Sequence, residues 1–192
     1  MPIAVANVWA ATLFVVADMK TKNITFCGIS AAAATVIMIT AYFPYLTYAI
    51  PCIASLVIMA VVIELGNKYA FATYLASLLP VFLFCETEAK LLYICLVGFY
   101  PILKAVFEKV KIRALEYILK FILVNAAVFA IYLLSTFVFG IPIDDMGELG
   151  KYGSVILLAA ANITFFLYDM CIGKMALFYI IRIHPSVKKM LK

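Results

Sequence analysis

Six long apolar blocks, separated by short polar or glycine-containing stretches, make up most of the chain. They run over Ile24–Phe43, Leu46–Leu65, Lys68–Cys85, Lys90–Glu108, Ala114–Phe139 and Ser154–Ile183. About 20 apolar residues suffice for a helix to cross a bilayer, and these runs are continuous, whereas the strands of a membrane β-barrel alternate. The pattern predicts an all-α membrane protein, with residues 19–192 forming a single bundle of six transmembrane helices.

Prolines and glycines divide this pattern. Pro44 and the Gly66–Asn67 pair separate the first three blocks, and Pro101 falls inside the fourth. Because proline has no backbone N–H, we expect Pro101 to kink its helix and to leave backbone carbonyls without their usual donors.

The first 18 residues are apolar but short, and they lack the basic start of a signal peptide. Met19 is followed by two lysines and then by the first long block, which is typical of a natural start. We therefore expect residues 1–18 to be an N-terminal extension or to follow from a misplaced start codon. The alternative is an additional short helix over residues 3–17.

Composition supports the membrane interpretation. Of the 192 residues, 68% are hydrophobic, and the mean hydropathy is +1.15, whereas soluble domains are about 45–50% apolar. The five cysteines lie in or beside the apolar blocks without a CxxC pair, as expected for small core side chains. The net charge of +5 does not indicate a nucleic-acid partner, because its distribution has another explanation.

Lysine and arginine are distributed unevenly between the two predicted sides. If the chain before the first block is cytoplasmic, thirteen of the 15 basic residues lie on that side, and only Lys90 and Lys151 lie outside. Cytoplasmic segments carry an excess of lysine and arginine. The chain is therefore predicted to be a multi-pass protein of the plasma membrane, with both termini in the cytoplasm and membrane lipid around it.

Charged residues inside the apolar blocks are the first candidates for a site. A carboxylate at membrane depth, such as Asp169, costs about 2.5–3.5 kcal/mol and must face protein or water. Lys104 lies at a similar depth, and Glu64 lies near the cytoplasmic end of its block. We expect Glu64, Lys104 and Asp169 to share a buried charge network in the inner leaflet. Such a network either holds the helices in register or forms a proton or substrate pathway.

Amide and tyrosine side chains are the candidates for substrate binding. Asn125 and Asn162 lie near the predicted bilayer centre, and Tyr42, Tyr93 and Tyr132 lie in the outer half. These five side chains fit an aromatic-walled ligand cleft. The alternatives are an amide bond between two helices and an aromatic belt at the membrane surface.

Signals for an enzyme are weak. His184 is the only histidine, and no second histidine or suitably placed nucleophile accompanies it. The chain contains none of the HExxH, GxSxG or Walker motifs. The expectation is a protein without catalytic residues, metal or cofactor.

Three stretches carry a resemblance to a known family. They are MKTKNITFCGISAAAATVIMI, IELGNKYAFATYLAS and GFYPILKAVFEKVK. With six short-looped spans and an alanine-rich first span, the chain resembles the S component, the substrate-binding membrane subunit of energy-coupling factor (ECF) transporters. Within that family it is similar to an uncharacterised S-component-like group.

The resemblance implies a function and its partners. The protein would bind a small-molecule nutrient without hydrolysing ATP, and it would dock on a transmembrane coupling subunit that works with two cytoplasmic ATPases. An outward-facing cleft would be capped by Pro44–Tyr45 and Gly140–Gly153. Small residues on the first span would form the docking face, namely Cys27, Ser30, Ala31, Ala34 and Thr35. The first rival is a structural or assembly membrane protein without a ligand, like the rod-shape-determining family, and a membrane enzyme is the second.

Overall fold

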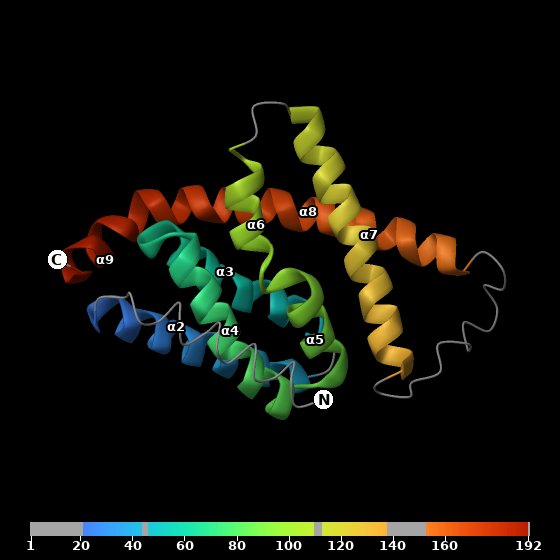
Figure 1. Cartoon of the computed structure of the whole chain (residues 1–192), viewed down its shortest axis with the longest axis horizontal. Helices are drawn as coiled ribbons and strands as arrows, with labels where there is room; N and C mark the ends of the chain where they lie inside the picture. The colour runs from blue at the N-terminus through green and yellow to red at the C-terminus, as the bar shows by residue number, and fades with distance from the viewer. Residues whose placement is uncertain (1–20, 44–45, 110–112, 138–152, 192) are drawn as a thin grey trace.

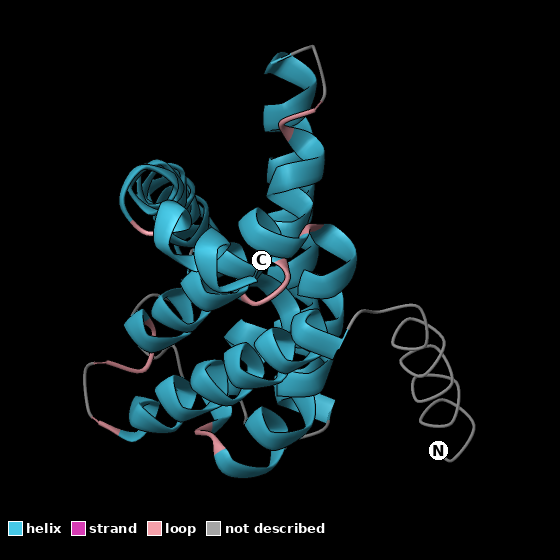
Figure 2. Cartoon of the chain, turned by 90° about the vertical axis from the view of Figure 1, so that its left-hand side faces the viewer, coloured by secondary structure: helices cyan, strands magenta, loops and turns pink. Residues whose placement is uncertain are grey.

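The computed structural model describes residues 21–43, 46–109, 113–137 and 153–191, and within these ranges all regular structure is helical (Figure 2). The elements are α2 (Thr21–Ile39), η1 (Thr40–Tyr42), α3 (Ala49–Leu65), α4 (Asn67–Phe84), α5 (Thr87–Leu92), η2 (Tyr93–Val97), α6 (Tyr100–Phe107), α7 (Arg113–Phe137), α8 (Gly153–Arg182) and α9 (His184–Leu191). The prediction of an all-helical protein is confirmed for these residues. The predicted extension over residues 1–18 lies outside them.

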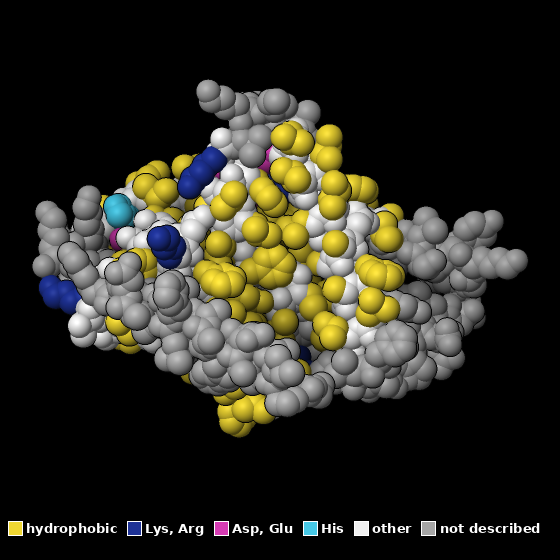
Figure 3. Space-filling model, viewed as in Figure 1, with side chains coloured by type: hydrophobic (Ala, Val, Ile, Leu, Met, Phe, Trp, Pro, Cys, Tyr) yellow, Lys and Arg dark blue, Asp and Glu magenta, His cyan; other side chains and the backbone are white. Residues whose placement is uncertain are grey.

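Among the described residues, three helical stretches are long and apolar enough to cross a membrane. They are Thr21–Tyr42, Thr87–Phe107 and Leu158–Arg182. Large apolar side chains point outward from them, and Ile29 and Ile181 are 65% and 76% exposed. Hydrophobic side chains also cover the described surface between α4 and α7 (Figure 3). Soluble monomers rarely expose apolar surface on this scale, so the chain has the features of a multi-pass membrane protein.

Helices α2, α3 and α4 lie side by side and form the N-terminal part of the molecule (Figure 1). Small side chains allow this close packing, because Ala34, Ala54 and Ala70 are fully buried where the three helices meet. Between α3 and α4 the chain reverses at Gly66, whose φ of 89° is a conformation that other residues rarely adopt. The predicted break at Gly66–Asn67 is therefore present.

The C-terminal part has a different arrangement. Helix α8 crosses α6 and α7 instead of running alongside them (Figure 1), whereas a regular bundle of six spans would place them nearly parallel. A second apolar cluster fills this crossing, with Tyr100, Val124 and Ile172 among its buried side chains. Because crossing helices touch over a short length, the residues at the crossing point decide how they are held together.

The helix that contains Pro101 is interrupted, as predicted. The π-helical turn η2 ends at Val97, and α6 begins at Tyr100 after a short turn. Pro101 cannot donate to the carbonyl of Val97, four residues earlier. The hydroxyl of Tyr168 in α8 lies 3.3 Å from that carbonyl, but it donates mainly to Oγ of Ser55 in α3, over 2.7 Å. A polar side chain from the crossing helix therefore faces the carbonyl that Pro101 leaves without a backbone donor.

Candidate functional site

Asp169 of α8 lies where α6, α7 and α8 converge. Its Oδ1 accepts from the hydroxyl of Tyr100 and from Nζ of Lys104, each over 2.5 Å, and its Oδ2 accepts from Nζ of Lys120 over 2.8 Å. One carboxylate therefore receives three donors from two other helices. Both lysine side chains and that of Asp169 are at most 12% exposed.

Two further carboxylates extend this ion cluster. Glu108 lies 3.2 Å from Nζ of Lys104, and Glu116 lies 2.6 Å from Nζ of Lys120. When all five groups are ionised, three carboxylates face two ammonium groups, so the ion cluster of Lys104, Glu108, Glu116, Lys120 and Asp169 carries one net negative charge. Each buried lysine consequently has two acidic partners, which offsets the cost of removing it from water.

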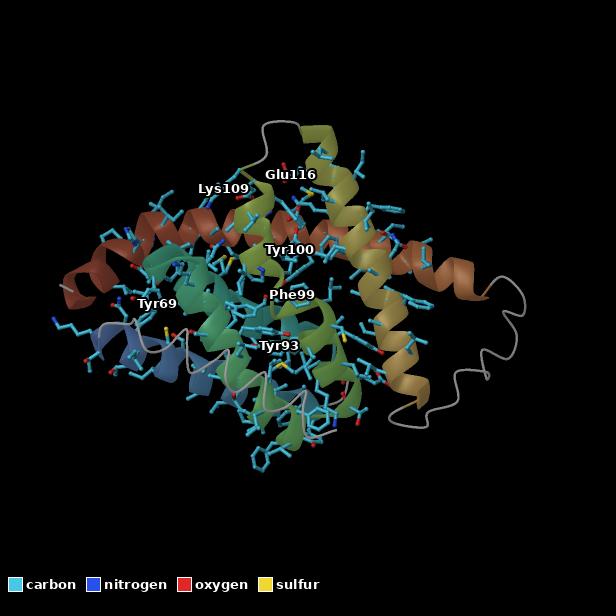
Figure 4. The ribbon with its side chains drawn as sticks, viewed as in Figure 1. Tyr69, Tyr93, Phe99, Tyr100, Lys109 and Glu116 are labelled. Atoms are coloured by element: carbon cyan, nitrogen blue, oxygen red, sulfur yellow. The ribbon has the colours of Figure 1, made fainter. Side chains whose placement is uncertain are left out.

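Helical spacing brings these groups together. Tyr100 and Lys104 are four residues apart on α6, and so are Glu116 and Lys120 on α7, so each pair shares one helix face. On α8, Gly173 follows Asp169 by one turn, and a Cβ there would lie 4.0 Å from Nζ of Lys104. In Figure 4, Tyr100 lies near the crossing with α8, whereas Tyr93 lies lower, between α4 and α5.

Of the predicted charge network, Lys104 and Asp169 come together, but Glu64 does not join them. Its Oε1 lies 3.0 Å from Nδ1 of His184, at the junction of α8 and α9, and its side chain is only 2% exposed. The prediction for Glu64 is therefore wrong. Similar depth along two helices does not decide which helix faces which, and the end of α3 meets the end of α8 instead of its middle.

The two predicted asparagines face each other across α7 and α8. Their side-chain amides are 3.4 and 3.5 Å apart in the two directions, which is long for a hydrogen bond between an N–H and an oxygen. Each amide also donates to a backbone carbonyl of its own helix, to Phe121 from Asn125 over 2.7 Å and to Leu158 from Asn162 over 2.8 Å. The amide pair of Asn125 and Asn162 is thus held mainly by contacts within each helix.

A pocket of about 380 Å³ opens between α7 and α8, beside the ion cluster and the amide pair. Asn162, Asp169 and Lys120 contribute its polar lining. Aromatic and aliphatic side chains form the rest of its wall, namely Tyr117, Ile118, Phe121, Val124, Phe165 and Phe166. This α7–α8 pocket is small for a ligand site but within the usual range.

The predicted tyrosines do not gather around this pocket. Tyr42 is 62% exposed on η1, and Tyr93 is fully buried, with its hydroxyl 3.0 Å from that of Ser77. The side chain of Tyr132, together with Pro44–Tyr45 and most of Gly140–Gly153, lies outside the described residues. The expected cleft built from Tyr42, Tyr93 and both asparagines is therefore not formed, because only the asparagines meet.

The small residues predicted to form a docking face are buried in the structure and do not form a free surface. The five residues turn toward α3 and α4, and each is between 0% and 8% exposed. They are Cys27, Ser30, Ala31, Ala34 and Thr35. Small residues allow close helix approach both inside a molecule and between molecules, so their spacing alone could not distinguish the two.

Tyr100, Glu116 and Lys120 were missed as members of the site. Glu116 and Lys120 lie in the first turns of the fifth apolar block and look like groups at the membrane surface. Their spacing of four residues, which matches that of Tyr100 and Lys104, is the signal that identifies a shared face. No protein-family model, curated protein or solved structure matches the chain.

Proposed function

We propose that this chain is a multi-pass plasma-membrane protein that binds a small nutrient as the substrate-binding subunit of an ECF-type transporter. The observation that carries the proposal is the α7–α8 pocket, with its aromatic walls and Asn162 beside the ion cluster. Its walls are almost entirely apolar, and Asn162, Lys120 and Asp169 contribute the few polar groups that could orient a ligand. Because the pocket lies beside Asp169, the ligand site of this proposal is in the inner half of the membrane.

Contacts at the helix ends support the proposed six-span topology. Asn23, at the start of α2, donates to the hydroxyl of Tyr69 at the start of α4 over 3.0 Å. The pair of Glu64 and His184 joins the end of α3 to the end of α8. All four residues belong to the side assigned to the cytoplasm by the excess of basic residues.

A contact on the opposite side supports the same assignment. The hydroxyl of Tyr48, just before α3, donates to Glu88 at the start of α5 over 2.6 Å. Tyr48 lies at the outer end of the second predicted span and Glu88 lies in the loop after the third, so the contact joins two segments of the outer side.

The rival proposal, a structural membrane protein without a ligand, is favoured by the ion cluster. Its lysines and Asp169 are mutually paired, which is what helix registration alone requires. The two proposals differ in partners and in transport. We propose a transmembrane coupling subunit and cytoplasmic ATPases as partners, with a docking surface other than the buried small residues of α2.

Affinity purification of the full chain from its native membrane, followed by reconstitution into liposomes, tests the transporter proposal. We expect a membrane subunit and P-loop ATPases to co-purify with the chain. We expect the reconstituted complex to take up a nutrient only when ATP is supplied. Recovery of the chain without ATPases, or with cell-shape proteins in their place, would support the structural alternative.

A further inference from the structure

The α7–α8 pocket opens sideways, between two helices that cross. Tyr117, Ile118, Phe121 and Phe166 line it, and each is 51–59% exposed. In a chain with these apolar surfaces, we expect side chains so exposed on α7 and α8 to meet lipid tails. The mouth of the pocket would then face the bilayer, and its ligand would enter from the membrane.

The charges beside the pocket argue against an ionic ligand. Lys120 and Lys104 already have two acidic partners each, and the ion cluster carries one net negative charge. An added anion would meet this excess of negative charge. An added cation would find the carboxylate of Asp169, which lines the pocket, already accepting from Tyr100, Lys104 and Lys120. In surroundings of low polarity either change is costly.

The amide pair offers the pocket a neutral hydrogen-bonding group. The amides of Asn125 and Asn162 are separated by 3.4–3.5 Å, so each retains capacity for a better partner. A ligand with one hydroxyl or carbonyl could form a hydrogen bond with the amide of Asn162. Its apolar part would fill the space between Phe121 and Phe166.

We propose that the α7–α8 pocket binds a small, uncharged and largely apolar molecule that carries one hydrogen-bonding group and enters laterally from the bilayer. The inference rests on the proposed function, since it names the class of nutrient that the substrate-binding subunit would take. The lipid-facing mouth, the paired charges and the incompletely bonded amides all point to this class.

Photolabelling of the purified full chain in lipid nanodiscs tests the inference. The probe is azioctanol, a diazirine-bearing alcohol, and its comparison is the diazirine-bearing octane without the hydroxyl. We expect azioctanol to label peptides of α7 and α8 at the pocket, in competition with excess octanol. A single hydrogen bond predicts about two- to tenfold more labelling by the alcohol than by the alkane, and Asn162→Leu should remove this preference.

A matched pair of variants locates the label. Ile118 lines the pocket, whereas Ile122, one turn further along α7, is similarly exposed and does not. We expect Ile118→Trp to abolish labelling and Ile122→Trp to preserve it, with both variants checked for a monodisperse elution. If Ile118→Trp fails to fold, competition by octanol on the unaltered chain still decides the question.

Other outcomes would overturn the inference. Equal labelling by the alcohol and the alkane would contradict the hydrogen bond, and labelling outside α7 and α8 would contradict the site. Displacement of the probe by phospholipid as readily as by octanol would show that the pocket holds a lipid chain. None of these measurements requires a partner subunit. The transporter proposal fails by a different result, namely that no ATPases co-purify and no uptake is measured.

Discussion

Tyr168 of α8 donates to Oγ of Ser55 in α3 over 2.7 Å. The same hydroxyl lies 3.3 Å from the carbonyl of Val97, which Pro101 deprives of its backbone donor. One side chain of α8 thus links the interrupted helix to α3, at the edge of the crossing that holds the ion cluster.

We expect Tyr168→Phe to lower the free energy of unfolding by about 1–3 kcal/mol, because it removes the hydroxyl that faces the buried Oγ of Ser55 and the carbonyl of Val97. In a Ser55→Ala background the acceptor of the shorter bond is already absent, so the same change should cost less. Thermal unfolding of the four proteins in detergent measures this coupling. Tyr42→Phe, at an exposed tyrosine, is the control, and strictly additive effects of the two changes would contradict the assignment.

Gly98 is required by close packing. A Cβ there would lie 2.7 Å from the carbonyl oxygen of Tyr93 and 2.8 Å from a ring carbon of Tyr74. Gly98→Ala should therefore lower the unfolding free energy by about 1–3 kcal/mol. Gly28→Ala is the matched control, since a Cβ at Gly28 meets nothing within 4 Å, and it should stabilise α2 by about 0.5–1 kcal/mol. A neutral Gly98→Ala would show that η2 packs less tightly.

The ion cluster should behave as one coupled unit. Asp169→Leu removes the carboxylate shared by two lysines, so we expect a loss of about 3–5 kcal/mol in detergent unfolding. Adding either Lys104→Met or Lys120→Met should recover part of that loss, because fewer buried cations are then left without a carboxylate.

Lys174→Met is the control on the same helix. Lys174 is exposed, and its neutralisation should change stability by less than about 0.5 kcal/mol. If Lys120→Met proved as harmless, or if its effect simply added to that of Asp169→Leu, the contact between Lys120 and Asp169 would be refuted.

The side of the membrane that each loop faces can be tested in a variant without the native cysteines. Single cysteines in place of Lys111 and Lys188 should resist an impermeant thiol reagent added from outside, while one in place of Lys90 should react. The reason is the thirteen-to-two division of basic residues. Efficient labelling from outside at position 111 or 188 would contradict the proposed topology.

The sequence predicted the helices well because their signal is local. Within the described residues, each long apolar block is helical and begins or ends within a few residues of its predicted bounds, and the chain is interrupted at Gly66 and just before Pro101. The helix α9 was read only as a basic tail, because its eight residues are too polar and too short to stand out.

The site was less predictable because it depends on which helix faces cross. Depth along a helix paired Lys104 with Asp169 but gave Glu64 the wrong partner. By the same criterion Lys120 lies at the membrane surface, whereas in the structure it is buried and paired with Asp169. The steep crossing of α8 over α6 and α7 leaves no mark in hydropathy. Whether Ala31 and Ala34 face a neighbouring helix or another protein is likewise a matter of tertiary packing.

The central claim is that the α7–α8 pocket holds a small uncharged ligand, and native mass spectrometry of the chain released from nanodiscs tests it most directly. We predict a bound small molecule on the unaltered protein and on Ile122→Trp. At unchanged folding, the molecule should be lost from Ile118→Trp, and its affinity for Asn162→Leu should fall by about two- to tenfold. The absence of any bound mass from protein freshly extracted from its native membrane, or equal retention by Ile118→Trp, would contradict the account.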